Sequence, residues 1–159
     1  PGENTSTKSI EKAKEIFKLS GSSIVTVKKE IDGFILNRLQ GALLNEAMRL
    51  YSEGYASSED IDATIKDGLG LRWAFMGPFE TIDLNAPGGI KDYMARYGSI
   101  FIEMAKSQTK IPDWSDDAGS KLELERRKVL SKDDLEKRAK KRNFLLKQLR
   151  RLKIESDES

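Results

Sequence analysis

The segment from Asp32 to Glu53 most constrains the fold, because it predicts one long helix that is apolar around most of its circumference. Asp32 fits the N-cap of this helix, and Gly54 fits its end. Two neighbouring stripes carry the apolar residues at helical spacing, one with Leu36, Leu39, Leu43, Ala47 and Leu50 and the other with Gly41, Leu44 and Met48. A helix with so narrow a polar arc must be covered by other helices, so we expect it at the centre of an all-α domain.

Asn37 falls in line with the second stripe, where the helix is expected to be buried. An unpaired amide away from water costs about 1–3 kcal/mol, so a buried asparagine either holds a structural hydrogen bond or faces a binding site. Gly41 lies one turn further along, and its missing side chain allows another backbone or a ligand to come close. On the residues alone the structural hydrogen bond is the simpler interpretation, and the site interpretation stays open.

The first 30 residues predict a helix followed by a strand. Apolar residues at helical spacing predict a helix from Thr5 to Leu19, which Gly21 ends, and Ser23–Val27 has the β-branched pattern of a short strand. One helix and one strand cannot form a domain, so we interpret residues 1–30 as the last αβ unit of a sheet whose other strands lie upstream. Pro1 in place of methionine fits a chain cut from a longer one. Residues 31–159 then form the helical domain.

The remainder of the chain predicts further helices separated by glycine and proline. Ser57 fits the N-cap of a helix that ends at Gly68–Gly70, and an irregular stretch, Leu71–Gly77, follows. Four more helices are then expected, over residues 78–84, 88–106, 116–130 and 132–154. The last of these follows Ser131–Asp134, which resembles a capping box.

The composition excludes several kinds of chemistry. The chain has no histidine and no cysteine, so it supplies neither the commonest general base near neutral pH nor thiolate chemistry. We expect no metal site, because Asp60 and Asp62 are first-turn acids that favour the helix dipole and have no third ligand in view. No apolar run approaches the roughly 18–20 residues of a membrane span. With no signal peptide visible, we expect a cytoplasmic protein.

Charge is divided unevenly along the chain. Residues 126–153 contain 13 basic and three acidic residues, whereas the rest of the chain contains 15 basic and 23 acidic residues. Such a basic segment is suited to nucleic-acid phosphates. The same segment carries an apolar stripe, so we favour a helix that packs on the acidic body, either its own or that of a partner. The stripe consists of Leu135, Phe144, Leu145, Leu149 and Leu152.

Several ordered motifs resemble one enzyme family. Asp32–Arg38 resembles the Gly-Phe-x-x-Asn-Arg signature that opens the C-terminal domain of the 3-hydroxyacyl-CoA dehydrogenase family. The family's order continues, over about residues 1–106, with Glu46-Ala47, Glu53-Gly54, Asp60-Ile61-Asp62, Gly68-Leu69-Gly70 and Met76-Gly77-Pro78-Phe79-Glu80. Within the family, Leu71–Pro78 is most similar to the lambda-crystallin branch, which includes L-gulonate 3-dehydrogenase. The related carnitine dehydrogenases share an arginine–tryptophan pair here, so the branch stays open.

The resemblance implies the C-terminal part of an NAD-dependent 3-hydroxyacyl-CoA or 3-hydroxy-acid dehydrogenase. In such an enzyme a Rossmann domain binds NAD at a glycine-rich turn and carries a histidine–glutamate pair as general base and orienter. The helical domain closes the active site and forms the dimer. This sequence has no Gly-x-Gly-x-x-Gly turn and no histidine. We therefore expect no cofactor on this chain, no catalysis by the chain alone, and self-association into a homodimer.

The resemblance also implies site residues. Asn37 matches the family's active-site asparagine, which hydrogen-bonds near the reacting oxygen of the substrate, and it is our candidate catalytic residue. Arg72 beside Trp73 fits a fork onto a substrate carboxylate, with a loop salt bridge as an equal alternative. Asn85 either lines the cleft or caps the helix that begins near Pro87, and capping is the favoured interpretation. Two non-enzymatic alternatives stay open: a structural dimerisation module and, less favoured, a nucleic-acid binder.

Overall fold

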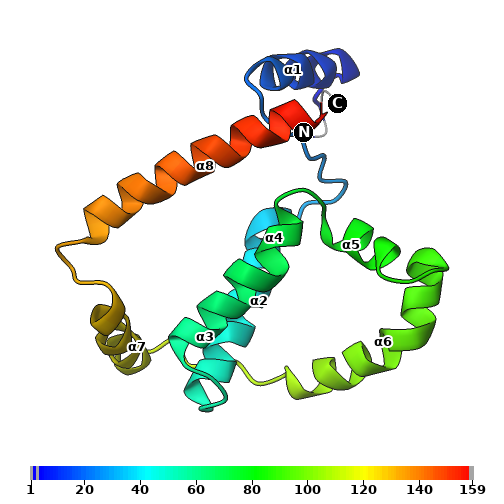
Figure 1. The fold of residues 1–159 in the computed structure, drawn as a ribbon. Coiled ribbons are helices and arrows are strands. Elements are labelled where there is room, and N and C mark those ends of the chain that lie inside the picture. Colours follow the sequence, from blue (N-terminus) through cyan, green and yellow to red (C-terminus); the bar gives the residue numbers. More distant parts are fainter. Residues whose placement is uncertain (1, 3, 158–159) are drawn as a thin grey trace. The chain divides into compact units, whose positions relative to one another are not determined.

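The computed structural model describes residues 2 and 4–157, and these residues form helices and no β-strand (Figure 1). The all-α prediction is therefore confirmed for the described part of the chain. The chain divides into two compact units, residues 1–42 and residues 43–159, and the division falls within one helix. The elements are α1 (Thr7–Leu19), α2 (Phe34–Ser52), α3 (Ser58–Ala63), the π-helix η1 (Thr64–Leu69), α4 (Gly70–Trp73), α5 (Pro78–Leu84), α6 (Gly89–Ser107), α7 (Asp116–Val129) and α8 (Leu135–Asp157).

Helix α1 ends at Leu19 as predicted, and it begins at Thr7, two residues after the predicted start at Thr5. Ser6 is its N-cap, and the Ser6 hydroxyl oxygen accepts a hydrogen bond of 3.2 Å from the backbone N–H of Ser9. Gly21 has a φ of 70° and follows the helix, so the chain can turn back there. The N–H groups of Gly21 and Ser22 bond the carbonyls of Lys18 and Phe17, which is a Schellman motif.

The strand predicted at residues 23–27 does not form. These residues have no regular structure. A β-strand exists through hydrogen bonds to a neighbouring strand, and the described residues contain no other strand that could pair with this segment. The predicted αβ unit is thus present only as its helix. The domain boundary predicted after residue 30 stays a prediction.

Helix α2 is the predicted long helix, but it begins at Phe34 rather than directly after Asp32. Gly33 and Phe34 have positive φ values of 80° and 48°, so the chain turns sharply before the helix. Asp32 is therefore not the N-cap, a correction that follows from this turn. The N-terminal half of α2 is also uncovered, with Leu36 75% and Leu39 60% exposed. The expectation of a central helix covered by other helices is wrong for this half of α2. Apolar spacing shows that one helix face is suited to burial, but it does not determine which neighbours are present to cover that face.

Helix α3 continues beyond the predicted stop at Gly68–Gly70. Elements α3, η1 and α4 follow one another without a break as far as Trp73. Gly70 stays helical with a φ of −63°, and its N–H donates to the carbonyl of Ile65 across a π turn. A Cβ at Gly70 would lie 2.8 Å from that carbonyl oxygen. The glycine thus permits a wide turn instead of ending the helix, and the irregular stretch predicted from Leu71 is wrong in its first residues.

The later helices agree closely with the predicted ranges, except at the start of α8. Ser131–Asp134 forms a turn before the helix, in which the Ser131 hydroxyl oxygen accepts a 3.2 Å hydrogen bond from the N–H of Asp134. Helix α8 therefore begins three residues later than expected, at Leu135. Within residues 43–159, α5 packs against α6 and α3 packs against α7.

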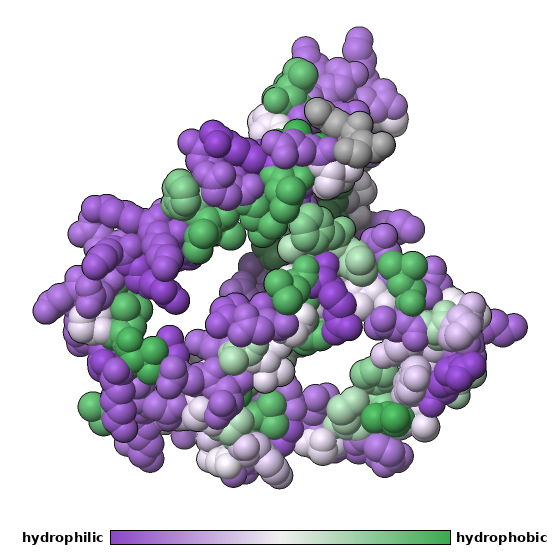
Figure 2. Space-filling view, viewed as in Figure 1, coloured by the Kyte–Doolittle hydropathy of each residue, from purple (hydrophilic) through white to green (hydrophobic). Residues whose placement is uncertain are grey.

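Few side chains in the described residues are buried. Large apolar side chains remain exposed on most elements, and Figure 2 shows many of them at the visible surface. Among the described residues, no helix is long and apolar enough to cross a membrane. The buried residues are Met48, Ser58, Thr81, Ala86 and Ala118.

Candidate functional site

Asn37 lies in the first turn of α2, directly after the positive-φ turn at Gly33 and Phe34. Its side chain is exposed, so the expectation of a buried amide is wrong. Within residues 2 and 4–157, no hydrogen bond to this side chain is present, and the structural hydrogen bond considered from the sequence has no partner there. An exposed amide keeps both its N–H₂ donor and its carbonyl acceptor available to a bound molecule.

Arg72 and Trp73 end the continuous helix that runs from α3 through α4. Both side chains are exposed, and Trp73 is 41% exposed. In the described part of the chain, Arg72 makes no ion pair, so the alternative of a stabilising salt bridge is not found there. The guanidinium of Arg72 is thus presented to solvent from a helix end, and the half-exposed Trp73 follows it in the sequence.

Asn85 is the C-cap of α5, where its backbone N–H bonds the carbonyl of Ile82 at 3.3 Å. It does not cap the next helix, which corrects the favoured interpretation of this residue. Asp83 takes that part, because its Oδ1 accepts a 2.7 Å hydrogen bond from the N–H of Ile90. A carboxylate caps a helix as well as an amide does, so the residue type of Asp83 also suits this part.

Asp92 stabilises the same start of α6 from within the helix. Its Oδ2 accepts from the N–H of Gly88 at 3.2 Å, and its Oδ1 accepts from Nε of Arg96 at 2.7 Å. The hydrogen bond from Arg96, followed by that from Gly88, holds the pKa of the Asp92 carboxyl below its usual range. This polar cluster is therefore part of the helix framework.

A second polar cluster lies along the C-terminal half of α2. Nε of Arg49 donates to Glu46 at 2.9 Å, and its Nη1 donates to Glu53 at 3.2 Å, so Arg49 joins the two carboxylates. The hydrogen bond from Arg49 lowers the pKa of Glu46, with a further contribution from Gln108. The Arg49 guanidinium also lies over the ring of Tyr55, 5.8 Å from its centroid. All three nitrogens of the Arg49 guanidinium donate to Glu46 or Glu53, so the cluster is structural.

Glu125 of α7 joins three elements that are far apart in the sequence. One of its carboxylate oxygens accepts a 2.7 Å hydrogen bond from the backbone N–H of Ser58. The Ser58 side chain and backbone lower the pKa of Glu125, with Tyr51 contributing less. Burial, and then the contact with Glu125, raises the pKa of Tyr51. Sequence analysis missed this cluster, because nothing in a local pattern connects residues 67 positions apart.

The candidate residues occupy separate elements. Arg72 and Trp73 lie at the end of α4 and Asn85 lies at the end of α5, and in the described residues no hydrogen bond or ion pair joins them. Asn37 belongs to the unit formed by residues 1–42, and the other three belong to the unit formed by residues 43–159. Arg72 and Trp73 therefore share one helix end, and Asn37 and Asn85 each lie at the end of another helix.

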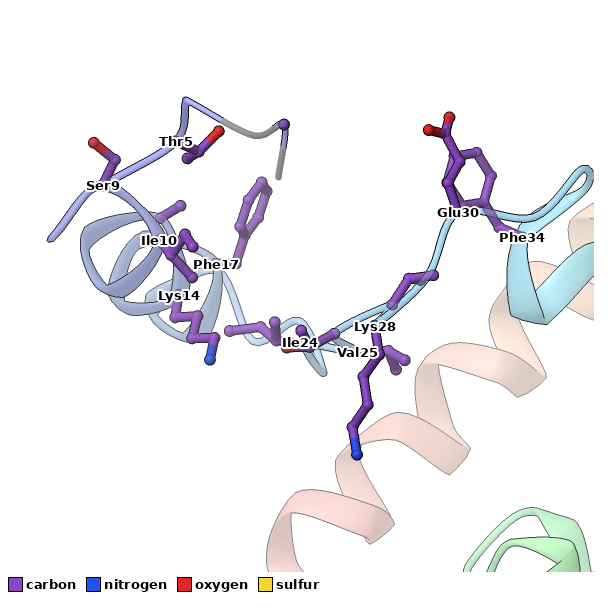
Figure 3. Close-up of a pocket in the computed structure, with 14 residues that line it drawn as sticks. Thr5, Ser9, Ile10, Lys14, Phe17, Ile24, Val25, Lys28, Glu30 and Phe34 are labelled. Carbon is purple, nitrogen blue, oxygen red and sulfur yellow. The ribbon is translucent and has the colours of Figure 1, made fainter. Parts of the chain in front are cut away.

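An open hollow of about 710 Å³ lies in the first unit, between α1 and residues 24–34 (Figure 3). Its wall is largely apolar and includes Ile10, Phe17, Ile24, Val25 and Phe34. Such a wall fits an apolar partner. The charged side chains of the lining are Lys14, Lys28 and Glu30. Sequence analysis found the apolar face of α1 that forms one side of this hollow.

The described residues do not fit NAD. The pyrophosphate of a dinucleotide is held by a glycine-rich turn at an open helix N-terminus. The N-terminus of α1 is instead closed by the Ser6 side chain, and the sequence has no Gly-x-Gly-x-x-Gly turn. In residues 2 and 4–157, no group of three or more His, Cys, Asp or Glu side chains is placed to hold a metal ion.

Residues 33–130 match the family model described as 3-hydroxyacyl-CoA dehydrogenase, C-terminal domain. Lambda-crystallin from Oryctolagus cuniculus is 40% identical over 155 residues, which cover 96% of this chain and 48% of that protein. L-carnitine dehydrogenase from Streptomyces coelicolor is 40% identical over 98 residues, or 61% of this chain and 31% of that protein. The 3-hydroxyacyl-CoA dehydrogenase from Gibberella moniliformis is 37% identical over 117 residues, which cover 74% of this chain and 34% of that protein. The chain thus spans about half or less of the length of these relatives.

Proposed function

This chain belongs to the 3-hydroxyacyl-CoA dehydrogenase C-terminal domain family, and we propose that it supplies the substrate side of an NAD-dependent 3-hydroxy-acid dehydrogenase. The family resemblance inferred from the ordered motifs is confirmed. The match over residues 33–130 carries the proposal, because it begins at the turn before Asn37 and extends past Arg72 and Asn85. Relatives named for L-carnitine and for 3-hydroxyacyl-CoA point to a hydroxyl on the β carbon of a carboxylate or a thioester.

Asn37 would hydrogen-bond the reacting oxygen of the substrate. Its exposed amide on the first turn of α2 supports this role, because the donor is not used within the described residues. A fixed amide donor aimed at an oxygen on which charge develops contributes about 2.7–4 kcal/mol to lowering a barrier. Water must be kept away for the donor to act at that strength.

Arg72 would bind a carboxylate of the substrate. A guanidinium forks onto a carboxylate with two parallel N–H···O hydrogen bonds, and the thioester of an acyl-CoA offers no such partner. Arg72 is exposed and makes no ion pair in the described part of the chain, which supports this role. Trp73 lies next to it and offers an apolar wall, and the exposed Asn85 is a further candidate contact. We therefore favour a small hydroxy acid over an acyl-CoA.

The chain's own residues do not complete the reaction. They include no histidine to accept the hydroxyl proton and no turn that fits NAD, so we derive no hydride or proton transfer from them. We propose that the chain alone is inactive and that NAD and the base are held by another domain. The proposed roles on this chain are to bind, orient and exclude water.

The proposed function is tested by joining this chain to the NAD-binding domain of a relative. The N-terminal domain of the rabbit lambda-crystallin is fused before residue 1, and NADH formation is followed with L-gulonate, L-carnitine and a 3-hydroxyacyl-CoA. We expect turnover of a hydroxy acid, and we expect Asn37→Ala to lower kcat by about 10²–10³-fold. Gln40→Ala, an exposed change one turn along α2, is the matched control and should change little.

Two outcomes would contradict the proposal in different places. A fusion that binds NAD but turns over none of the three compounds would contradict the dehydrogenase function. If Asn37→Ala and Gln40→Ala were equally active, the proposed dehydrogenase function would stand, but the proposed role of Asn37 would be contradicted. Arg72→Gln should raise KM for the carboxylate substrates and leave the thioester unaffected, and the reverse pattern would favour the acyl-CoA.

A non-enzymatic helical module that self-associates is the second candidate. The exposed apolar residues of α1 and α2 favour it, because uncovered apolar surface of this extent promotes association. We propose self-association, with a homodimer as the expected state. Light scattering on the 159-residue chain tests this, and a monomer at high concentration would contradict it.

A further inference from the structure

We propose that the basic helix α8 docks onto the acidic surface of α3 and α7 in a second copy of this chain. The proposal concerns how two copies recognise each other and does not depend on the dehydrogenase function. Two observations support it: within the residues that the structure describes, α8 is left largely exposed, and a surface of opposite charge lies on the same chain. We call residues 57–68 and 113–125 the acidic lobe.

Helix α8 is a strongly cationic helix that is exposed along nearly its whole length. Residues 135–157 contain nine basic and three acidic residues, a net charge of +6. Its large apolar side chains also face solvent, with Phe144 61% and Leu152 52% exposed. The family match ends at residue 130, so α8 lies beyond the family domain. The rabbit relative matches 96% of this chain, so that match includes most of α8.

The charges of α8 are mostly left without acidic partners. Lys140 pairs with Glu136 at 2.7 Å within the helix. Six other cations make no ion pair within residues 2 and 4–157. A partner that pairs with all six cations must offer a surface with several carboxylates. These six are Lys137, Arg138, Lys141, Lys147, Arg151 and Lys153.

The apolar residues of α8 indicate a protein partner. Leu145, Leu149 and Leu152 are spaced by four and three residues, which places them in one seam of the kind that packs against another helix. Nucleic acid would neutralise the lysines and arginines but would leave this seam in water. A membrane-bound helix needs an apolar face free of cations, and Arg138 and Arg142 continue the seam of α8.

The acidic lobe has the matching charge. Residues 57–68 and 113–125 contain nine acidic and two basic residues, a net charge of −7. The two segments are held together by the 2.7 Å hydrogen bond from Ser58 to Glu125 and by the ion pair of Arg126 with Asp62 at 3.3 Å. Leu124, 69% exposed, and Trp114, 57% exposed, add apolar surface among these carboxylates. Four carboxylates of the lobe, Asp62, Asp67, Asp117 and Glu123, already pair with cations of the same chain. Four others make no ion pair in the described residues, and together with the exposed apolar side chains they offer both kinds of contact that α8 lacks. These four are Glu59, Asp60, Asp113 and Asp116.

The linker between α7 and α8 favours a second copy over the chain's own lobe. Ser131 and Asp134 bond each other through side chain and backbone, so the linker is a defined turn. Lys132 ties this turn to Glu123 of α7 at 3.2 Å. The side chains of α8 remain exposed after this turn, so the chain's own lobe does not cover them. Two copies that exchange α8 would make the same contact twice, as a two-fold dimer does.

The test measures the dimer dissociation constant of the 159-residue chain by analytical ultracentrifugation. We expect a dimer that weakens as salt is raised from about 50 to 500 mM. The triple change Lys137→Glu, Lys141→Glu and Arg151→Glu in α8 should weaken it by about tenfold or more. The matched control, Lys8→Glu, Lys12→Glu and Lys18→Glu in α1, changes the net charge equally and should have little effect. Circular dichroism checks that each variant keeps its helices.

A charge exchange identifies the receiving surface. The triple change Glu59→Lys, Asp116→Lys and Asp117→Lys in the acidic lobe should also weaken the dimer. In a mixed dimer of this variant with the α8 variant, one contact is that of the wild type and the other has both charges reversed, so both are complementary. The mixture should therefore associate more tightly than either variant alone. A chain that stays monomeric, an α8 variant that dimerises like the α1 control, or a mixture without gain would overturn the proposal. So would salt-sensitive binding of α8 to a labelled DNA duplex by a monomeric chain.

Discussion

Trp114 donates a hydrogen bond of 3.1 Å from its Nε1 to Oδ1 of Asn45, which lies 69 residues earlier. The contact joins the middle of α2 to the break between α6 and α7. We predict that Trp114→Phe and Asn45→Ala each lower the free energy of unfolding by about 0.5–1.5 kcal/mol, as expected for one hydrogen bond. Urea denaturation measures the loss, and the double variant should lose less than the sum of the two. Strictly additive losses would show that the pair does not interact in solution.

The glycines of the π turn should respond in opposite directions to alanine. A Cβ at Gly70 would lie 2.8 Å from the backbone oxygen of Ile65, whereas a Cβ at Gly68 would meet nothing within 4 Å. Gly70→Ala should therefore lower the free energy of unfolding by about 1–3 kcal/mol, because the added methyl group crowds this oxygen. Gly68→Ala should stabilise by up to about 1 kcal/mol, because alanine loses less backbone entropy in a helix. Urea midpoints of the two variants provide the comparison, and equal shifts would argue against the π turn.

Asp83 and Asn85 give a second matched pair. Asp83 accepts a hydrogen bond from the N–H of Ile90 at the start of α6, whereas Asn85 takes part in its helix end through its backbone alone. Asp83→Ala should lower the free energy of unfolding by about 0.5–2 kcal/mol, as the loss of an N-cap does. Asn85→Ala should stay within about 0.5 kcal/mol, as expected for an exposed position. Thermal unfolding followed by circular dichroism distinguishes them, and a larger loss at Asn85 would reverse the assignment of the cap.

Acid should weaken the link between α2, α3 and α7. The pKa values of Glu46 and Glu125 are lowered from the ordinary 4.5, chiefly by Arg49 and by Ser58 respectively. A carboxyl whose folded-state pKa is lowered stabilises the fold above its unfolded value of 4.5 and loses that contribution as the pH falls through the folded value. Stability should therefore fall below about pH 4.5.

The variants Glu46→Gln and Glu125→Gln test this pH dependence. Each should be less stable than the wild type at neutral pH and should show a shallower loss on acidification. Glu11→Gln, which removes a carboxylate from α1 outside these contacts, is the control. If the stability of Glu125→Gln fell on acidification as much as that of the wild type, the contact of Glu125 with Ser58 would not contribute to the pH dependence of stability.

Sequence reasoning located helix ends well where the signal is local. Ser57 caps α3 through a 3.2 Å hydrogen bond from the N–H of Asp60, as predicted. Pro78 begins α5 and Gly54 ends α2, also as predicted. Each of these signals acts within about four residues, so the information is contained in a short segment. The same reasoning failed at Gly70, because a glycine can end a helix or permit a wide turn inside it, and the two look alike in sequence.

The candidate site shows the same division. The family motifs identified Asn37, Arg72, Trp73 and Asn85, and their roles stay predictions. The exposure of Asn37 could not be predicted, because a helical stripe does not state which neighbours are present to cover it. The contact of Glu125 with Ser58 was missed for a related reason, since it exists only after two distant helices pack.

The sequence by itself determined the helical class, most helix boundaries, the family and the separation of charge between body and tail. These follow from local hydrogen bonding, side-chain spacing and composition, which are properties of short segments. Only the tertiary structure decided that residues 23–27 stay unpaired, that α2 is half uncovered and that α8 stands exposed beside a defined turn. Those outcomes depend on which surfaces meet, and burial is a property of a residue's neighbours rather than of the residue.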